Sequence, residues 1–250
     1  MLKIMYLAFL LSTPSHLSAE DLSSGERTER VQGIAVDKNN QFFYTETSVL
    51  TYKKNKLEKI DINYTSEDGK LMAELHSDLK KNPYLPDIQM TDHRDQYEYK
   101  ITYLPDEKKV EISLKEDDHS PWSAKKITYK ENMTNSMGIM TYIHEHSADL
   151  KREKKKIFRF IIPSRQDDYG IVLEFLPTND KNDNLLNFNF KMQNFLIRSI
   201  AGNSDNRLQF DQKNLRITHF EGISNLLDEK NHSVDVTITY KLLESKAETK

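Results

Sequence analysis

Apolar and polar residues alternate along many short stretches of the chain. The clearest stretches cover residues 60–64, 97–103 and 234–240, where every second residue is a large apolar or aromatic one. This period of two predicts β-strands with one face buried and the other face in water. Such strands are typical of antiparallel sheets, because parallel strands are usually buried on both faces and read as continuous apolar runs.

Turn-forming residues separate these stretches. Asp68-Gly69 lies between the runs "KIDINYT" and "LMAELHSDL" and predicts a tight hairpin. The segment "PDEKK" (105–109) separates the stretch 97–103 from another alternating run at 110–114. Two runs, "IFRFIIP" (157–163) and "IVLEFLP" (171–177), are more continuously apolar. They are typical of central strands.

Helical spacing is limited to two segments. The first runs from Thr134 to Leu150, where Asn135 or Ser136 could cap a helix, and a shorter one spans Met192 to Ile200. No internal repeat or linker divides the chain. We therefore expect a mainly β protein with one large, curved, half-barrel-like antiparallel sheet, and one or two helices on its apolar face.

The N-terminus predicts secretion. Lys3 precedes a short apolar run, "IMYLAFLLS", which is followed by a polar segment that ends in small residues at Ala19. This layout is typical of a signal peptide over residues 1–19, cleaved near Ala19, which leaves a single β-rich domain over 20–250. A buried N-terminal strand or helix is the alternative. The absence of cysteine suits a bacterial periplasm or secretion.

Composition narrows the function. The net charge of −3 gives no electrostatic argument for binding nucleic acid, so no nucleic-acid partner is expected. After the N-terminal run, no stretch approaches the ~20 apolar residues of a membrane-spanning helix. The chain has no cysteine, which excludes disulfides, cysteine metal ligands and cysteine nucleophiles. We expect no cofactor.

Aromatic residues supply the first candidate site. Tyrosine is frequent in the alternating stretches, and the candidate ligand-binding residues are Tyr97, Tyr99, Tyr103, Tyr64 and Tyr44. Their rings could line an apolar groove that holds a lipid chain or a peptide. The alternative is a packed core in which the phenol oxygens reach the rim.

Histidines supply the second candidate site. The segment "HEH" contains His144 and His146, and zinc needs at least three converging protein ligands. On a strand the two histidines share a face, and His119 or His93 is the third ligand to test. On the expected helix they point in different directions and cannot share a metal. The metalloprotease pattern fails because Ala148 replaces its second histidine.

A cationic run, "KREKKK" (151–156), follows the histidines. It could bind anionic lipid headgroups. The alternative is a solvated turn that protects a sheet edge from aggregation.

Two segments carry a resemblance to known proteins. The stretch "LRITHFEGISNLLDEKNHSVDVTITY" (215–240), together with "FFYTE" (42–46), resembles a group of uncharacterised secreted β-rich bacterial proteins. In that group an aromatic-Glu-Gly-x-Ser-Asn-Leu stretch precedes the last strand. The expected architecture is also similar to the half-barrels of periplasmic lipoprotein carriers. Neither resemblance assigns a functional residue, because fold does not fix function.

These observations predict a secreted, periplasmic, non-enzymatic protein. Its sheet would bind an apolar or amphipathic ligand of the cell envelope, or a segment of a partner envelope protein. One alternative is a secreted hydrolase that uses histidine and carboxylate groups, with or without a metal. Another is an assembly factor that pairs through an open sheet edge.

Overall fold

The computed structural model describes residues 25–177, 184–193, 206–228 and 232–247. Within these ranges fifteen strands form one sheet, and one α-helix lies against it. The predicted fold, a large, curved, half-barrel-like antiparallel sheet, is therefore confirmed. The expected signal peptide and residues 194–200 of the second expected helix lie outside the described residues, and Met192 ends a strand.

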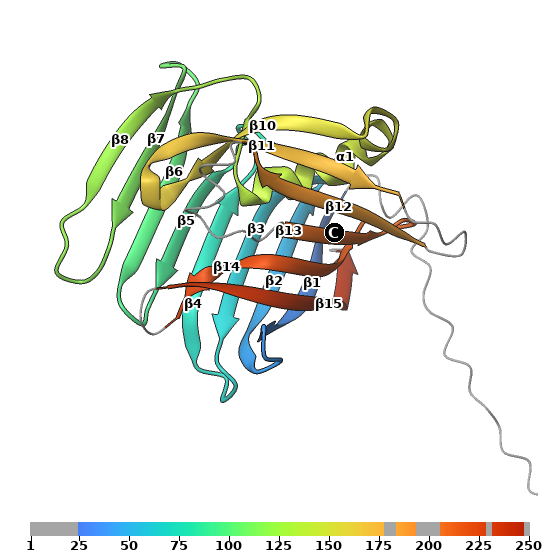
Figure 1. Cartoon of the computed structure of the whole chain (residues 1–250), viewed down its shortest axis with the longest axis horizontal. Helices are drawn as coiled ribbons and strands as arrows, with labels where there is room; N and C mark the ends of the chain where they lie inside the picture. The colour runs from blue at the N-terminus through green and yellow to red at the C-terminus, as the bar shows by residue number, and fades with distance from the viewer. Residues whose placement is uncertain (1–24, 178–183, 194–205, 229–231, 248–250) are drawn as a thin grey trace, which may run out of the picture.

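The first half of the sheet is an up-and-down series in which each strand pairs antiparallel with the next (Figure 1). The predicted hairpin at Asp68-Gly69 joins two of these strands, and Gly69 has the positive φ of +83° that such turns require. The strands are β1 (Glu26–Asp37), β2 (Phe42–Lys53), β3 (Lys56–Thr65), β4 (Leu71–Asp78), β5 (Asp87–Asp92), β6 (Tyr97–Leu104), β7 (Lys109–Lys115) and β8 (Ser123–Thr128).

The second half continues the sheet from the other side of β1. The first and last strands pair, so the order runs from β8 to β1, then from β15 back to β9. All neighbours are antiparallel except β9 and β10. The elements are β9 (Met133–Thr134), α1 (Ser136–Glu153), β10 (Lys155–Ile162), the short 3-10 helix η1 (Pro163–Arg165), β11 (Asp167–Leu176), β12 (Leu185–Met192), β13 (Asn206–Asp211), β14 (Ile217–Leu227) and β15 (Ser233–Ala247).

The expected alternation is present in the burial of the strands. Ile60, Ile62 and Tyr64 of β3 are buried, whereas the residues between them are more exposed. One expectation needs correction: the run 157–163 forms β10, which has only the two-residue β9 on one side and is not central. The run is apolar because Phe158 and Ile161 of β10 enter two different core clusters.

The two ends of the sheet meet without forming a strand pair within the described residues. β8 and β9 follow each other in sequence. Side chains form contacts between the strands next to β8 and those next to β9. Asp168 at the start of β11 accepts hydrogen bonds from Arg159 of β10 and from Lys130, which follows β8. The Gln166 side chain donates to the backbone oxygen of Ile112 in β7 at 3.0 Å. We call this set of contacts, made by Lys130, Arg159, Gln166 and Asp168, the seam. With the seam in place, the curved sheet forms an incomplete barrel.

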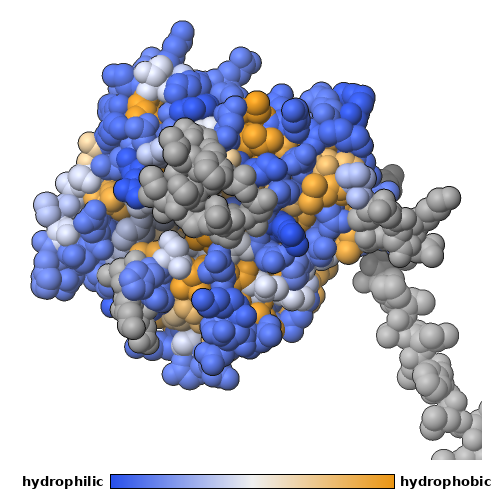
Figure 2. Space-filling model, viewed as in Figure 1, coloured by the Kyte–Doolittle hydropathy of each residue, from blue (hydrophilic) through white to orange (hydrophobic). Residues whose placement is uncertain are grey.

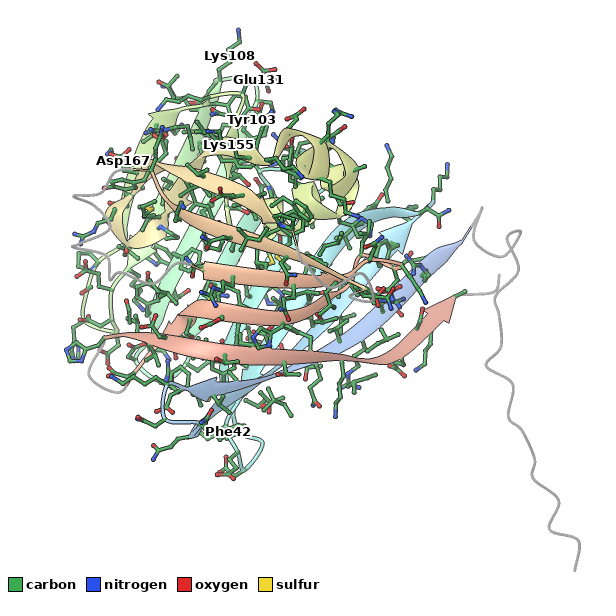
Figure 3. All side chains as sticks on the ribbon, turned by 45° about the vertical axis from the view of Figure 1, so that its right-hand side comes forward. Phe42, Tyr103, Lys108, Glu131, Lys155 and Asp167 are labelled. Carbon is green, nitrogen blue, oxygen red and sulfur yellow. The ribbon has the colours of Figure 1, made fainter. Side chains whose placement is uncertain are left out.

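Figure 3 shows the region near the seam from a second direction. Asp167, Tyr103 and Glu131 lie at one end of the molecule, and Phe42 lies at the opposite end. The Lys125 ammonium of β8 lies 2.8 Å from the Asp167 carboxylate, which adds a second ion pair across the seam.

Helix α1 is wedged between the two halves of the sheet. Asn135 caps it as predicted: its side chain accepts a hydrogen bond from the Gly138 amide and donates to the Pro86 oxygen. Met137 belongs to a core cluster built mainly from the first half, which also takes in residues of β14 and β15, whereas Ile139 and Ile143 belong to the cluster of the second half. The helix therefore fixes the spacing between the two walls. No helix in the described ranges is long and apolar enough to cross a membrane.

The seam yields a stability prediction. Burial alone would raise the pKa of Asp168, but hydrogen bonds from Arg159 and Lys130 outweigh it and lower that pKa. Replacing Asp168 by Ala leaves both cations without this acceptor. We expect Asp168→Ala to lower the free energy of unfolding by about 2 kcal/mol, measured by urea denaturation.

Asp167→Ala is the matched control for this measurement. Asp167 is the preceding residue, but its ion pair with Lys125 is exposed. Exposed pairs contribute little, so the control should lose less than about 1 kcal/mol. Equal losses in the two variants would contradict the role given to Asp168.

Candidate functional site

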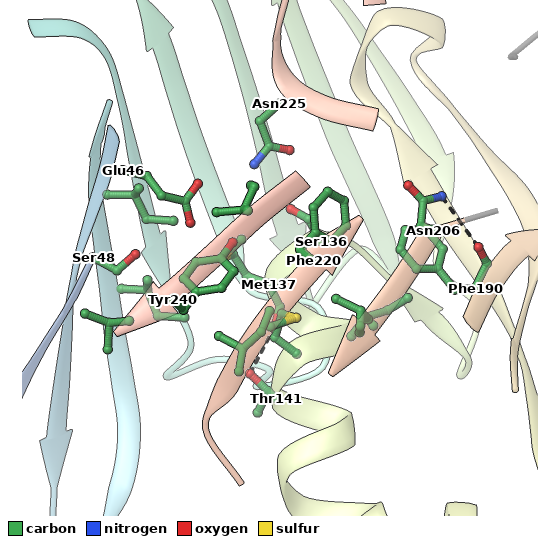
Figure 4. Close-up of a pocket in the computed structure, with 18 of the residues that line it drawn as sticks. Glu46, Ser48, Ser136, Met137, Thr141, Phe190, Asn206, Phe220, Asn225 and Tyr240 are labelled. Carbon is green, nitrogen blue, oxygen red and sulfur yellow. Dashed lines mark hydrogen bonds between the residues drawn. The ribbon is translucent and has the colours of Figure 1, made fainter. Parts of the chain in front are cut away.

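A cavity of about 1200 Å³ lies between the two halves of the sheet (Figure 4). It exceeds the ~300–1000 Å³ of common small-molecule sites. Its walls are mainly apolar and come from α1 and from strands on both sides of the β1–β15 pair. Apolar side chains on these walls include Ile60, Ile62, Met137, Phe160, Leu208 and Phe220.

Strand β2 supplies the most varied part of the wall. Its inward-facing residues alternate with outward ones, as in any strand with one buried face. The inward series consists of Tyr44, Glu46, Ser48, Leu50 and Tyr52, all of which line the cavity. The carboxyl group of Glu46 therefore lies within a series of otherwise apolar or weakly polar side chains.

Glu46 is the most unusual residue of the cavity. It is 5% exposed, and in the register of the sheet it lies between Gly33 of β1 and Tyr64 of β3. Burial raises its pKa to about 7, and the nearby Tyr240 phenol offsets part of that rise. Burial disfavours the charged form because the cavity wall solvates an anion less well than water does.

Gly33 makes room for Glu46. A Cβ atom at position 33 would lie 2.7 Å from Tyr240 Cε1, 2.8 Å from Ile238 Cγ2 and 2.9 Å from Glu46 Cγ. Real Cβ atoms do not approach other atoms so closely. Glycine here leaves room for the Glu46 side chain and the Tyr240 ring, which lie near each other in Figure 4.

Phenol groups surround Glu46. The rings of Tyr44 and Tyr64 meet edge to face with centroids 5.3 Å apart. Ser224 donates a hydrogen bond to the Tyr44 phenol oxygen, and Asn225 donates one to that of Tyr64 at 3.1 Å. Burial raises the pKa of Tyr44, Tyr64 and Tyr240. These phenols are therefore neutral near pH 7 and act as hydrogen-bonding groups.

Glu29 of β1 carries a second buried carboxylate. On β1 it lies two residues before Val31, which is the register partner of Ser48. Glu29 is 3% exposed and accepts hydrogen bonds from Arg27 and from both Nε and Nη2 of Arg216. The Arg27 guanidinium lies 4.0 Å above the centroid of the Tyr52 ring. This part of the wall is therefore a closed network in which the carboxylate has cationic partners.

The predicted tyrosine site is only partly assembled at the cavity. Tyr44, Tyr97 and Tyr99 line it. Tyr64 lies behind Tyr44 and contributes to the core. Tyr103 is not among the lining residues, because it packs against Tyr129 near the seam with ring centroids 4.8 Å apart. The role of these residues in binding stays a prediction.

The predicted histidine site is dispersed. His144 of α1 lines the cavity, whereas His146 forms a hydrogen bond to the Tyr84 phenol at 2.9 Å. His119 is exposed beside Asp118, and His93 pairs with Glu74. The described residues contain no group of three His, Asp or Glu suited to hold a metal. The convergence that the hydrolase alternative requires is therefore not formed within them.

The cationic run spans the end of α1 and the start of β10. Arg152 pairs with Asp149 on the same helix, and Lys154 ends the helix in a left-handed conformation. The Lys154 ammonium lies 5.1 Å from the centroid of the Phe175 ring.

Figure 2 shows one face of the molecule as mostly hydrophilic, with separate hydrophobic patches.

The sequence patterns did not mark Glu46 or Glu29 as candidate site residues. A signal was present for Glu46, because it shares the phase of Tyr44 and Tyr52 in the run "FFYTETSVLTY". A charged residue at an inward-facing position marks either an ion pair or a ligand site. Glu29 of β1 lies on the same face of the sheet as Glu46, but its partner Arg216 is distant in sequence.

Comparison with known proteins assigns no family to this chain. No family model matches the chain, and no curated protein matches it. A β-barrel-like protein of the DUF1849 domain of unknown function, from Brucella abortus, is similar at 7% identity and a TM-score of 0.46, covering 91% of this chain and 99% of that one.

Two further solved structures are similar over most of their length. A protein described as an outer-membrane lipoprotein-sorting domain, from Vibrio parahaemolyticus, has 11% identity, a TM-score of 0.25 and coverage of 92% and 89% of the two chains. A DUF1329 family protein from Desulfovibrio piger has 9% identity, a TM-score of 0.21 and coverage of 92% and 88%. The weak resemblance to β-rich uncharacterised proteins and lipoprotein carriers that the sequence suggests agrees with these neighbours. At TM-scores below 0.5 they carry no argument about ligand or activity.

Burial of Glu46 predicts a dependence of stability on pH. Its pKa rises from 4.5 in the unfolded chain to about 7 in the folded one. The folded state therefore binds the proton more tightly, and this group's stabilising contribution, complete below about pH 4.5, is lost as pH rises through about 7. Relative to the native chain, Glu46→Gln should gain up to about 3 kcal/mol of unfolding free energy between pH 4.5 and pH 8.

Urea denaturation of both proteins across this pH range measures the effect. The control is Glu131→Gln, which changes an exposed glutamate on the loop before β9. The difference in unfolding free energy between Glu131→Gln and the native chain should stay constant across this pH range. A constant difference for Glu46→Gln as well would contradict the raised pKa.

Proposed function

We propose that the protein is a secreted, periplasmic, non-enzymatic binding protein of the bacterial envelope. In this proposal residues 1–19 are a signal peptide cleaved near Ala19, and residues 20–250 form one β-rich domain. The cavity holds an apolar or amphipathic ligand, either a lipid-like molecule or the apolar segment of an envelope protein.

The observation that carries the proposal is the cavity itself. Protein interiors are normally packed as densely as organic crystals, with few voids larger than a water molecule. A space of about 1200 Å³ lined mainly by apolar side chains departs from that rule. Apolar ligands enter such spaces because burial of their surface is favourable, by roughly 25 cal/mol per Å².

The arrangement of polar groups also supports an amphipathic ligand. The polar residues Glu46, Ser48 and Asn225 lie on the cavity wall among apolar side chains such as Met137 and Phe220 (Figure 4). A few polar groups on an apolar wall are typical of sites that orient a ligand.

Filling part of the cavity should weaken binding. Leu50 of β2 faces the cavity, so Leu50→Trp places a large ring in the space that a ligand would occupy. We expect its affinity for the fluorescent apolar probe N-phenyl-1-naphthylamine to fall at least about tenfold, a loss of ~1.4 kcal/mol. Fluorescence titration of the mature chain measures the change.

Thr51→Trp is the matched control. Thr51 is the next residue of the same strand and is not part of the cavity wall, since successive side chains point to opposite faces. The control should bind the probe as the native chain does. Probe binding that is equal in both variants would place the probe outside the cavity and contradict the proposal.

Native mass spectrometry of the chain, purified from the periplasm of a bacterial host, tests the class of ligand. A bound mass that matches a lipid and is absent from Leu50→Trp supports a lipid-like ligand. A bound peptide mass supports the partner segment. A bound mass that persists in Leu50→Trp would count against the cavity as the binding site.

A further inference from the structure

We propose that the cavity selects amphiphiles whose polar group is a cationic amine, and that the Glu46 carboxylate pairs with that amine. This inference rests on the proposed binding function. It adds the chemical class of the ligand and names the residue that recognises it.

The first argument is the position of Glu46. Its side chain is nine-tenths buried, yet it forms part of the cavity wall. A carboxylate taken out of water is costly unless a partner charge and hydrogen bonds compensate it. The described residues place no lysine, arginine or histidine in an ion pair with Glu46.

The groups that face Glu46 are neutral. They are Tyr44 of β2 itself, Tyr64 of β3 and Tyr240 of β15, while β1 contributes Gly33. Elsewhere on the cavity wall, α1 contributes His144 and Glu145, η1 contributes Arg165, and Arg216 is paired with Glu29. The carboxylate thus has hydrogen-bonding neighbours and lacks a counter-charge.

The second argument is the contrast with Glu29. Both glutamates lie on the same face of the sheet, and both are at least 95% buried. Glu29 is held by two guanidinium groups, those of Arg27 and Arg216. The fold therefore supplies cations where a buried carboxylate is structural. At Glu46 it leaves that place open toward the cavity.

An amine fits this place better than other polar groups. An ammonium has three N–H donors and no acceptor. It can donate to the Glu46 carboxylate and to nearby acceptors on the same wall, such as the Ser48 hydroxyl and the Tyr240 phenol oxygen (Figure 4). A carboxylate or phosphate ligand would be repelled, and an alcohol would make a weaker hydrogen bond without charge.

Three probes with the same twelve-carbon chain test the inference: dodecylamine, dodecanol and dodecanoate. Their displacement of N-phenyl-1-naphthylamine from the mature chain is measured at about pH 8.5, where the carboxyl group is ionised and the amine is still protonated. We expect the amine to bind at least about tenfold more tightly than the alcohol, and dodecanoate to bind most weakly.

Glu46→Gln should abolish the preference. The amide keeps the shape but removes the charge, so the amine and the alcohol should then bind within about twofold of each other. The exposed control Glu131→Gln should keep the native ratio. A native chain that binds amine and alcohol equally, or an undiminished preference in Glu46→Gln, would overturn the inference.

A second measurement needs no variant. Lowering the pH from about 8.5 to about 5.5 neutralises Glu46 while the amine keeps its positive charge, so the preference of the native chain should fall severalfold. A preference that is unchanged at the lower pH would also overturn the inference. If none of the three probes displaces the dye at either pH, the proposed binding function itself fails, which is a different result from a loss of selectivity.

Discussion

The architecture depends on the seam, where side chains join the two ends of a single sheet. An open sheet of fifteen strands would expose two edges, and unpaired edges promote association with other chains. Here the edge strands β8 and β9 follow each other in sequence, and Asp168 connects them through Arg159 and Lys130. Because these contacts are made by side chains, the sheet curls without the tight radius of a hydrogen-bonded barrel.

This loose closure explains why a cavity is present. The helix that follows β9 enters between the walls and packs on both core clusters, and strand side chains join the walls only in places, as Ser224 does with Tyr44. The space beyond the helix is lined by Ile60, Ile62 and Phe220 and by the buried carboxyl group of Glu46. Packing stabilises the two clusters at the walls, and the volume between them is available to a ligand.

The sequence predicts the local elements well because alternation is a local property. The strands around Ile62 and Val236, the hairpin at Gly69 and the Asn135 cap all follow from neighbouring residues. The pairing of β1 with β15 and the seam join residues far apart in sequence, so periodicity could not predict them. The same limit explains Tyr103: it shares the phase of Tyr99, but its end of β6 lies at the seam and not at the cavity.

A cavity of this size has an energetic consequence for the whole fold. Its lining side chains lack the dispersion contacts that they would have in a filled core. The strand ladders, the seam and the Glu29 network must offset that loss in the empty protein. A ligand that fills the cavity restores contacts only in the folded state, so it adds stability in proportion to the logarithm of its concentration over its dissociation constant. Folding and binding are therefore coupled through the same apolar walls.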